Sequence, residues 1–228
     1  MAVSELPLIR ATLVIFARLR TSMYAALAKK PTVAAAKAAI LRQPLFRHSA
    51  PFTYSENHDI IFNMLVSFPP LVGENPKILI LGSMPGEVSL RMGQYYAHPQ
   101  NRFWKILFRY FSAPFSGDYA ARENLAVQNG VALWDTIQSC ERENSSLDSA
   151  IKSIIPNDVA GFLARHPNIK AIFTNGGKSR GIFEKHRTQI PDAVSYRPLP
   201  STSPANARMN LDSLYTVWAE ALSEFLGR

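Results

Sequence analysis

The chain has 228 residues, of which 47% are apolar and 11% aromatic, so it holds enough hydrophobic material for one globular domain of ordinary size plus an extension. Its single cysteine, Cys140, excludes an internal disulfide framework and any four-cysteine zinc or iron–sulfur site. The net charge is +8, but it is concentrated at one end, so it is not a nucleic-acid signature for the folded domain.

The N-terminal segment carries most of the positive charge. Residues 6–55 contain eight Lys/Arg and no acidic residue, whereas residues 56–228 contain seventeen Lys/Arg and sixteen Asp/Glu. Three interpretations stay open: an organelle transit peptide, helices that pack on the domain, or a basic arm that adds non-specific DNA affinity. The apolar stretch Leu13–Ala17 lies between Arg10 and Arg18 and is too short to span a membrane.

A change in composition near residue 66 predicts a domain boundary. Pro69-Pro70 and the stretch 73–76 punctuate the chain, and strand and helix patterns alternate from there on. We therefore expect residues 1–65 to form an extension and residues 66–228 to form the main domain. With one cysteine the protein is expected to be intracellular: cytoplasmic if bacterial, or in an organelle or the nucleus if the extension is a targeting peptide.

The main domain reads as alternating strands and helices. Short apolar or β-branched runs bounded by Gly, Asn or Pro predict strands, and three-to-four residue apolar spacing predicts helices between them. This alternation predicts an α/β fold, a three-layer α/β/α sandwich around a central, mostly parallel four-stranded sheet. The expected strands are Lys77–Leu81, Val131–Trp134, Lys170–Thr174 and Val194–Leu199, and the expected helices are Asn101–Phe111, Asp158–Arg165, Lys178–His186 and Leu211–Leu226.

Each expected strand is followed by a small polar loop. Because parallel strands end at one edge of a sheet, we expect the four loops to form a single cleft. The first loop, GSMPG, lacks the spacing of a dinucleotide site and the Gly-Lys-Ser/Thr ending of a P-loop, so alone it is consistent with a simple tight turn. The loops are Gly82–Gly86, Trp134–Thr136, Asn175–Lys178 and Pro200–Pro204.

Two further segments combine polar groups with stacking faces or rigid backbone. In Gln94–Trp104, aromatic rings stand beside His98 and Asn101 just before a helix, although Asn101 is equally suited to capping that helix. The PSTSP loop carries three hydroxyls between two prolines. Such a loop can contact phosphates or enter a groove, or it can be an ordinary connection.

Other catalytic templates are not supported. No G-x-S-x-G elbow of a serine hydrolase is present. The five histidines lack metal-ligand spacing, so we expect neither a metal nor another cofactor. Asp135 and Glu87 are candidates for a carboxylate pair, but the sequence does not fix their separation.

Five ordered motifs carry a resemblance to a known family. GSMPG, YYAHPQNRFWKIL, GVALWDTIQSCEREN with SSLDSAI, FTNGGK and LPSTSPAN follow one another over about residues 66–228. In this order and spacing they resemble the DNA-deoxyinosine (hypoxanthine-DNA) glycosylase group of the uracil-DNA glycosylase superfamily.

The resemblance implies a monofunctional base-excision enzyme that flips a deaminated base out of double-stranded DNA and hydrolyses its glycosidic bond. Hypoxanthine is the expected base, with uracil as a second candidate. In the mismatch-specific relatives, the position of Ser83 is an Asn that positions the attacking water. The resemblance implies that Asn101 takes over this role here, and that Ser83 and His98 are the other candidate catalytic residues, with His98 as a donor to the departing base. The remaining roles implied are base binding by Gly82, Met84, Pro85, Gly86, Tyr96 and Asn175, and DNA binding by Pro200, Ser201, Thr202, Ser203, Pro204, Asn206 and Arg208.

Two alternatives to this function remain at the level of the sequence. A glycosylase-like DNA-binding protein without catalysis is suggested by Ser83 in place of Asn, and a nucleoside hydrolase would use the same pocket on a small molecule. The resemblance further implies DNA as the partner. We also expect no membrane association, and a monomer, because a base-flipping enzyme of this size needs none of the symmetry that an oligomer supplies.

Overall fold

The computed structural model describes residues 64–142 and 147–227. The basic segment 6–55 and almost all of the expected extension lie outside this part of the chain. The boundary near residue 66 therefore stays a prediction.

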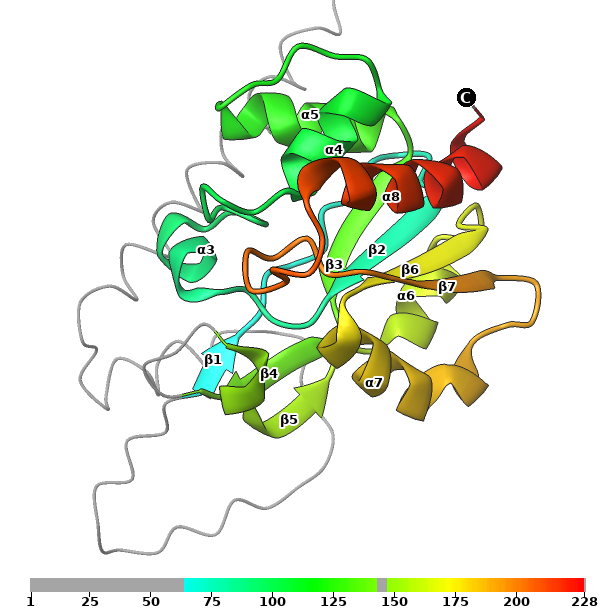
Figure 1. The fold of residues 1–228 in the computed structure, drawn as a ribbon. Coiled ribbons are helices and arrows are strands. Elements are labelled where there is room, and N and C mark those ends of the chain that lie inside the picture. Colours follow the sequence, from blue (N-terminus) through cyan, green and yellow to red (C-terminus); the bar gives the residue numbers. More distant parts are fainter. Residues whose placement is uncertain (1–63, 143–146, 228) are drawn as a thin grey trace, which may run out of the picture. The chain divides into compact units, whose positions relative to one another are not determined.

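The centre of the fold is a four-stranded parallel sheet (Figure 1). Its strands are adjacent in the order β3-β2-β6-β7, and β2 pairs in parallel with both β3 and β6. Every residue of β2 and β3 is buried, as expected of strands covered on both faces. The strands are β2 (Ile78–Gly82), β3 (Val131–Asp135), β6 (Ala171–Asn175) and β7 (Ser195–Leu199), each within one residue of its predicted range.

Helices cover both faces of the sheet. On one face Ile78 and Ile80 of β2 share a core with α4, α5 and α8, and on the other Leu79 and Leu81 pack with α6 and α7. This alternation along one strand is what a sheet between two helix layers requires, and it confirms the predicted three-layer α/β/α sandwich (Figure 1). The helices are α4 (Phe103–Tyr110), α5 (Tyr119–Gln128), α6 (Val159–Arg165), α7 (Gly177–His186) and α8 (Leu211–Leu226).

The last helix shows how sequence and packing agree. α8 begins where the Asn210 side chain accepts a hydrogen bond from the backbone N–H of Ser213, and it ends at Gly227, whose φ of 70° suits glycine. Leu214 and Trp218 on its predicted apolar stripe are fully buried. The stripe therefore fixes α8 against α4 and β7.

Several elements were not predicted. A small antiparallel sheet has the order β1-β4-β5, and its strand β5 is exposed along its whole length, so its sequence has no burial pattern. Only Thr136 separates β3 from β4. In the sequence the two strands therefore give the pattern of a single strand that is followed by a loop. The unpredicted elements are β1 (Met64–Val66), β4 (Ile137–Glu141), β5 (Lys152–Pro156), α3 (Glu87–Met92), α5 (Tyr119–Gln128) and the short 3₁₀ turns η1 (Asp148–Ala150) and η2 (Arg187–Gln189).

Within the described residues, no helix is long and apolar enough to cross a membrane.

Candidate active site

The carboxyl ends of the four parallel strands lie at one edge of the sheet. Gly82 at the end of β2 is paired in register with Asp135 at the end of β3, and Asn175 of β6 is paired with Leu199 of β7. The four polar loops leave the sheet from these positions. They are therefore neighbours, as the parallel topology predicts.

At this edge of the sheet, the side chains of Asp135 and Tyr96 come very close to the backbone of Gly82. A Cβ atom placed on Gly82 would lie 2.4 Å from Oδ1 of Asp135 and 3.3 Å from the hydroxyl oxygen of Tyr96. The first distance is far below a normal contact, so any larger residue here would displace Asp135 or Tyr96. The two side chains flank the strand end, and Gly82 allows both to reach it.

Tyr96 is held by the aromatic segment that the sequence singled out. Its ring stacks on Phe103, with centroids 4.0 Å apart and planes inclined by 26°. Phe103 is 1% exposed and belongs to the core, and the Tyr96 backbone has a φ of 53°, which is uncommon for a residue other than glycine. One ring face of Tyr96 thus rests on a rigid support, and its hydroxyl points to the strand ends.

Asn101 and His98 lie just before α4. The Asn101 Oδ1 accepts a hydrogen bond of 3.0 Å from the backbone N–H of Phe103, the first residue of α4, but the N-cap position is Arg102 and not Asn101 as expected. The amide nitrogen of the half-buried Asn101 has no partner among the described residues and can donate to a bound molecule. His98 is exposed, and its Nδ1 accepts from the N–H of Gln100 at 3.2 Å.

Two residues outside the predicted site fix the GSMPG loop. Ser83 Oγ donates to Oδ1 of Asp148 at 2.6 Å, and Arg142 Nη2 donates to the carbonyl oxygen of Pro85 at 2.6 Å. Arg142 is buried, and its Nε has no partner in the described part of the chain. Met84 is also buried, in a small core near β4, so its side chain supports the loop.

Asn175 connects β6 to the PSTSP loop. Its Nδ2 donates to the Thr202 hydroxyl at 3.0 Å, and its Oδ1 accepts the Thr202 backbone N–H at 2.9 Å. Both ends of the amide are therefore engaged by a residue that is itself fully buried. Base reading by Asn175 stays a prediction, and the observed contacts are those of a residue that positions the loop.

Arg102 organises the same loop from the start of α4. Its guanidinium donates to the backbone carbonyls of Ser203, Asn206 and Met209, and its Nε donates to that of Thr202. Burial lowers the pKa of Arg102 from its ordinary value. The loop also places Pro204 and Arg208 at the surface, with Ser201, Ser203 and Asn206 half-buried.

Asp135 is the site residue that the sequence did not assign. It is 4% exposed, and its Oδ2 has no partner among the described residues. Burial and the nearby Asp148 carboxylate raise the pKa of Asp135, Arg142 lowers it, and the net effect is a pKa of about 8. The sequence feature that could have identified Asp135 is its place as an acidic residue at the end of a buried strand. The sequence analysis considered Asp135 only as a partner for Glu87.

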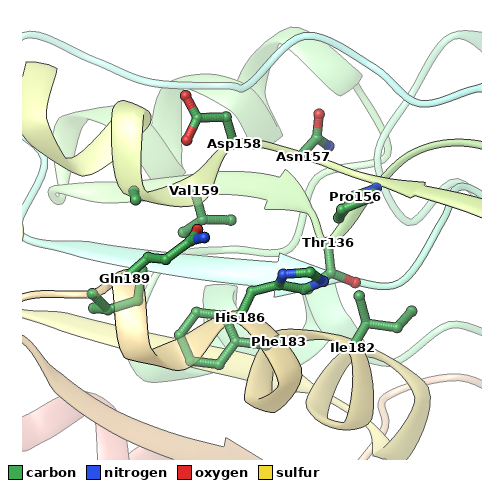
Figure 2. A pocket seen from close by; sticks show the side chains of 11 residues that line it. Thr136, Pro156, Asn157, Asp158, Val159, Ile182, Phe183, His186 and Gln189 are labelled. Atoms are coloured by element: carbon green, nitrogen blue, oxygen red, sulfur yellow. The ribbon is translucent and has the colours of Figure 1, made fainter.

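A cavity of about 260 Å³ lies elsewhere, between α6 and α7 (Figure 2). Its lining includes Thr136 of the expected Trp134–Thr136 loop, together with Asn157, His186 and Gln189, and no residue of the other three expected loops. Asp135 and Tyr96 are not part of this lining. Within residues 64–142 and 147–227, no cluster of three or more His, Cys, Asp or Glu could hold a metal ion.

The family profile of the Uracil DNA glycosylase superfamily matches residues 69–222. A hypoxanthine DNA glycosylase of Methanosarcina barkeri is 39% identical over 157 residues, which cover 68% of this chain and 95% of that protein. Another from Methanosarcina acetivorans is 35% identical over 147 residues, covering 63% and 89% respectively. A solution NMR structure of a Methanosarcina acetivorans protein, named as a candidate uracil DNA glycosylase, superposes with a TM-score of 0.59 at 30% identity over 69% of this chain and 98% of that one. With two thirds of its length matched, and with the strand-end site described above, this chain belongs to the uracil DNA glycosylase superfamily.

Proposed function

We propose that this protein is a monofunctional DNA glycosylase that removes hypoxanthine from double-stranded DNA. The observation that carries the proposal is the 39% identity to a hypoxanthine DNA glycosylase over 95% of that protein's length. The region matched by the superfamily profile, residues 69–222, includes the whole strand-end site. Because its substrate is DNA, the enzyme acts where DNA is found, and we propose that it acts as a monomer.

Access to the base comes first. A base inside a duplex cannot reach a protein pocket, so the nucleotide must be flipped out, at a cost of a few kcal/mol. The exposed part of the Pro200–Arg208 loop suits contacts with phosphates and the groove, because Arg102 holds its backbone in one conformation. The face of the Tyr96 ring that is turned away from Phe103 can then stack on the base, which contributes about 1–3 kcal/mol.

Bond breaking needs stabilised charge and a positioned water. As the N-glycosidic bond breaks, positive charge develops on the sugar and negative charge on the departing base. Backbone N–H groups of the Gly82–Gly86 loop and the exposed His98 are available donors to that negative charge. The Asn101 amide can hold the water that captures the sugar, and positioning suffices when bond breaking precedes attack.

Excision assays on defined duplexes test this function. Purified full-length protein is incubated with labelled duplexes that contain one inosine, uracil or xanthine, and each sample is divided before treatment with hot alkali. Breaks at inosine that appear only after alkali are expected, because a monofunctional glycosylase leaves an intact abasic strand.

Other outcomes would change the assignment. Breaks mainly at uracil would keep the superfamily and replace the substrate, a possibility raised by the candidate uracil DNA glycosylase among the similar structures. Retained DNA binding without breaks at any base would favour a non-catalytic binder. Cleavage of free inosine at a rate comparable to that of DNA would favour a nucleoside hydrolase.

A further inference from the structure

Two buried polar groups lie together at the same strand end, and one of them lacks a partner. The buried Oδ2 atom of Asp135 makes no hydrogen bond to any described residue, and the only group that acts on the buried Tyr96 hydroxyl as a hydrogen-bond partner is the side chain of Asn175, among the described residues. Both side chains converge on Gly82, where a Cβ atom would contact each of them. Buried polar groups in folded proteins are almost always hydrogen-bonded, so an orphaned carboxyl oxygen beside the Tyr96 hydroxyl at an active-site edge indicates a place for a ligand.

The stacking geometry says which part of a ligand would reach them. Phe103 covers one face of the Tyr96 ring, so a base can stack only on the other face. The rim of such a base then lies beside the Tyr96 hydroxyl and the neighbouring Asp135 carboxyl.

We propose that the Asp135 carboxyl and the Tyr96 hydroxyl bind the oxygen-bearing edge of the flipped base, which makes Asp135 a catalytic and specificity-determining residue. This inference rests on the proposed function, and it deepens that function by assigning the groups that recognise a deaminated base. Deamination replaces an amino group by an oxygen and places an N–H beside it. That edge therefore needs one donor and one acceptor from the protein.

The surroundings of Asp135 favour a form of its carboxyl that is both a hydrogen-bond donor and an acceptor. The charged and titratable groups that face it are Asp148 from η1, Arg142 after β4, and Tyr96 from the segment before α4. Burial and Asp148 outweigh Arg142 and raise the pKa of Asp135 to about 8. At neutral pH the carboxyl is therefore mostly uncharged, with an O–H that donates and a C=O that accepts.

The uncharged form also suits the chemical step. Negative charge develops on the base as it departs, and a carboxyl O–H aimed at the base oxygen stabilises that charge. An ionised carboxylate at the same place would repel it. The carboxyl keeps its proton throughout, because it donates a hydrogen bond and transfers nothing.

The pH dependence of excision tests the inference. Single-turnover excision of hypoxanthine from a labelled duplex is measured from about pH 6 to about pH 9.5 with the full-length wild-type protein and with Asp135→Asn and Asp135→Ala. We expect the wild-type rate to be constant well below pH 8 and to fall about tenfold per pH unit well above it, as the carboxyl ionises. Asp135→Asn keeps a donor and an acceptor without a titrating group, so its rate should lie within a few-fold of wild type at pH 7 and lack this fall.

Two further variants separate recognition from support of the fold. Asp135→Ala removes both hydrogen-bonding groups and should lose about 10²-fold or more at every pH. Tyr96→Phe keeps the stacking face and should lose about tenfold. If Asp135→Ala does not fold, the pH profile of Asp135→Asn and the excision rate of Tyr96→Phe still test whether these two groups bind the base.

Titration of the inosine base itself is controlled for, since it would appear in the wild-type and Asp135→Asn profiles alike. Parallel profiles for these two proteins, or full activity of Asp135→Ala, would overturn the inference while leaving the proposed function intact. A wild-type protein that excises hypoxanthine at no pH would instead contradict the proposed function.

Discussion

At the scale of single residues, Asn101 has two roles that an experiment can separate. Its Oδ1 accepts the Phe103 N–H at the start of α4, whereas its amide nitrogen is available to position water. Asn101→Ala should lower single-turnover excision by about 10²-fold or more, because a misplaced water alone costs that much. DNA affinity, measured by fluorescence anisotropy on the same duplex, should stay within a few-fold of wild type.

The capping role needs a matched control. Asp118→Ala removes a comparable cap from α5, where the Asp118 carboxylate accepts the Ala121 N–H at 3.1 Å. Each substitution should cost about 1 kcal/mol of unfolding free energy. If Asp118→Ala reduced excision as much as Asn101→Ala does, the loss would reflect stability and not water positioning.

Gly82 offers a steric test of the strand end. Gly82→Ala places a methyl group where Asp135 Oδ1 lies 2.4 Å away, so Asp135 or Tyr96 must move. We expect a loss of about 1–3 kcal/mol in unfolding free energy, measured by denaturant titration, together with a large loss of excision. Gly117→Ala is the control, because nothing lies within 4 Å of its added Cβ; equal effects of the two substitutions would argue against a crowded site at Gly82.

At the scale of elements, Arg102 joins the start of α4 to the Pro200–Arg208 loop through four backbone carbonyls. Arg102→Ala should free that loop, and binding must then restore its order at about 0.5–1.5 kcal/mol per immobilised side chain. We expect about tenfold weaker binding to an inosine duplex. Arg109→Ala, which removes a pair between exposed side chains of α4 and α8, should leave DNA affinity unchanged. Equal affinities for Arg102→Ala and wild type would mean that the loop keeps its conformation without Arg102.

The sequence predicts the elements that depend on local pattern. The four parallel strands and α8 are recognisable because continuous apolar runs and a single apolar stripe follow directly from burial. The β1-β4-β5 sheet escapes such reasoning, since β5 is exposed and its pairing with β4 is not encoded in its own periodicity. Pairing between distant segments appears only in three dimensions.

The same distinction applies to the site. Parallel topology predicts that the four loops meet, and they do. The pairing of Asn175 with Thr202, the anchoring of the GSMPG loop by Arg142 and the orphaned carboxyl of Asp135 depend on distances that the sequence does not contain. Whether an acidic residue is a solvated turn or a buried catalytic group is decided by what surrounds it.

At the scale of the whole molecule, charge is divided between two parts of the chain. Eight Lys/Arg without any acid lie in residues 6–55, while residues 56–228 are nearly neutral. The strands, loops and core residues that we assign to the site come from residues 64–142 and 147–227. Recognition of the base and non-specific attraction to DNA are therefore expected to be separable.

Deleting residues 1–60 tests that separation. We expect single-turnover excision at saturating protein to stay within about twofold of wild type, because every group in the chemistry remains. If the segment is a basic arm, DNA affinity should fall and its logarithm should depend less steeply on salt, by about 0.9 in slope for each phosphate that the arm no longer neutralises. An unchanged salt slope would favour a targeting segment. A truncated protein that no longer folds, judged by circular dichroism and thermal unfolding, would show that the segment is part of the domain and that the boundary near residue 66 is wrong.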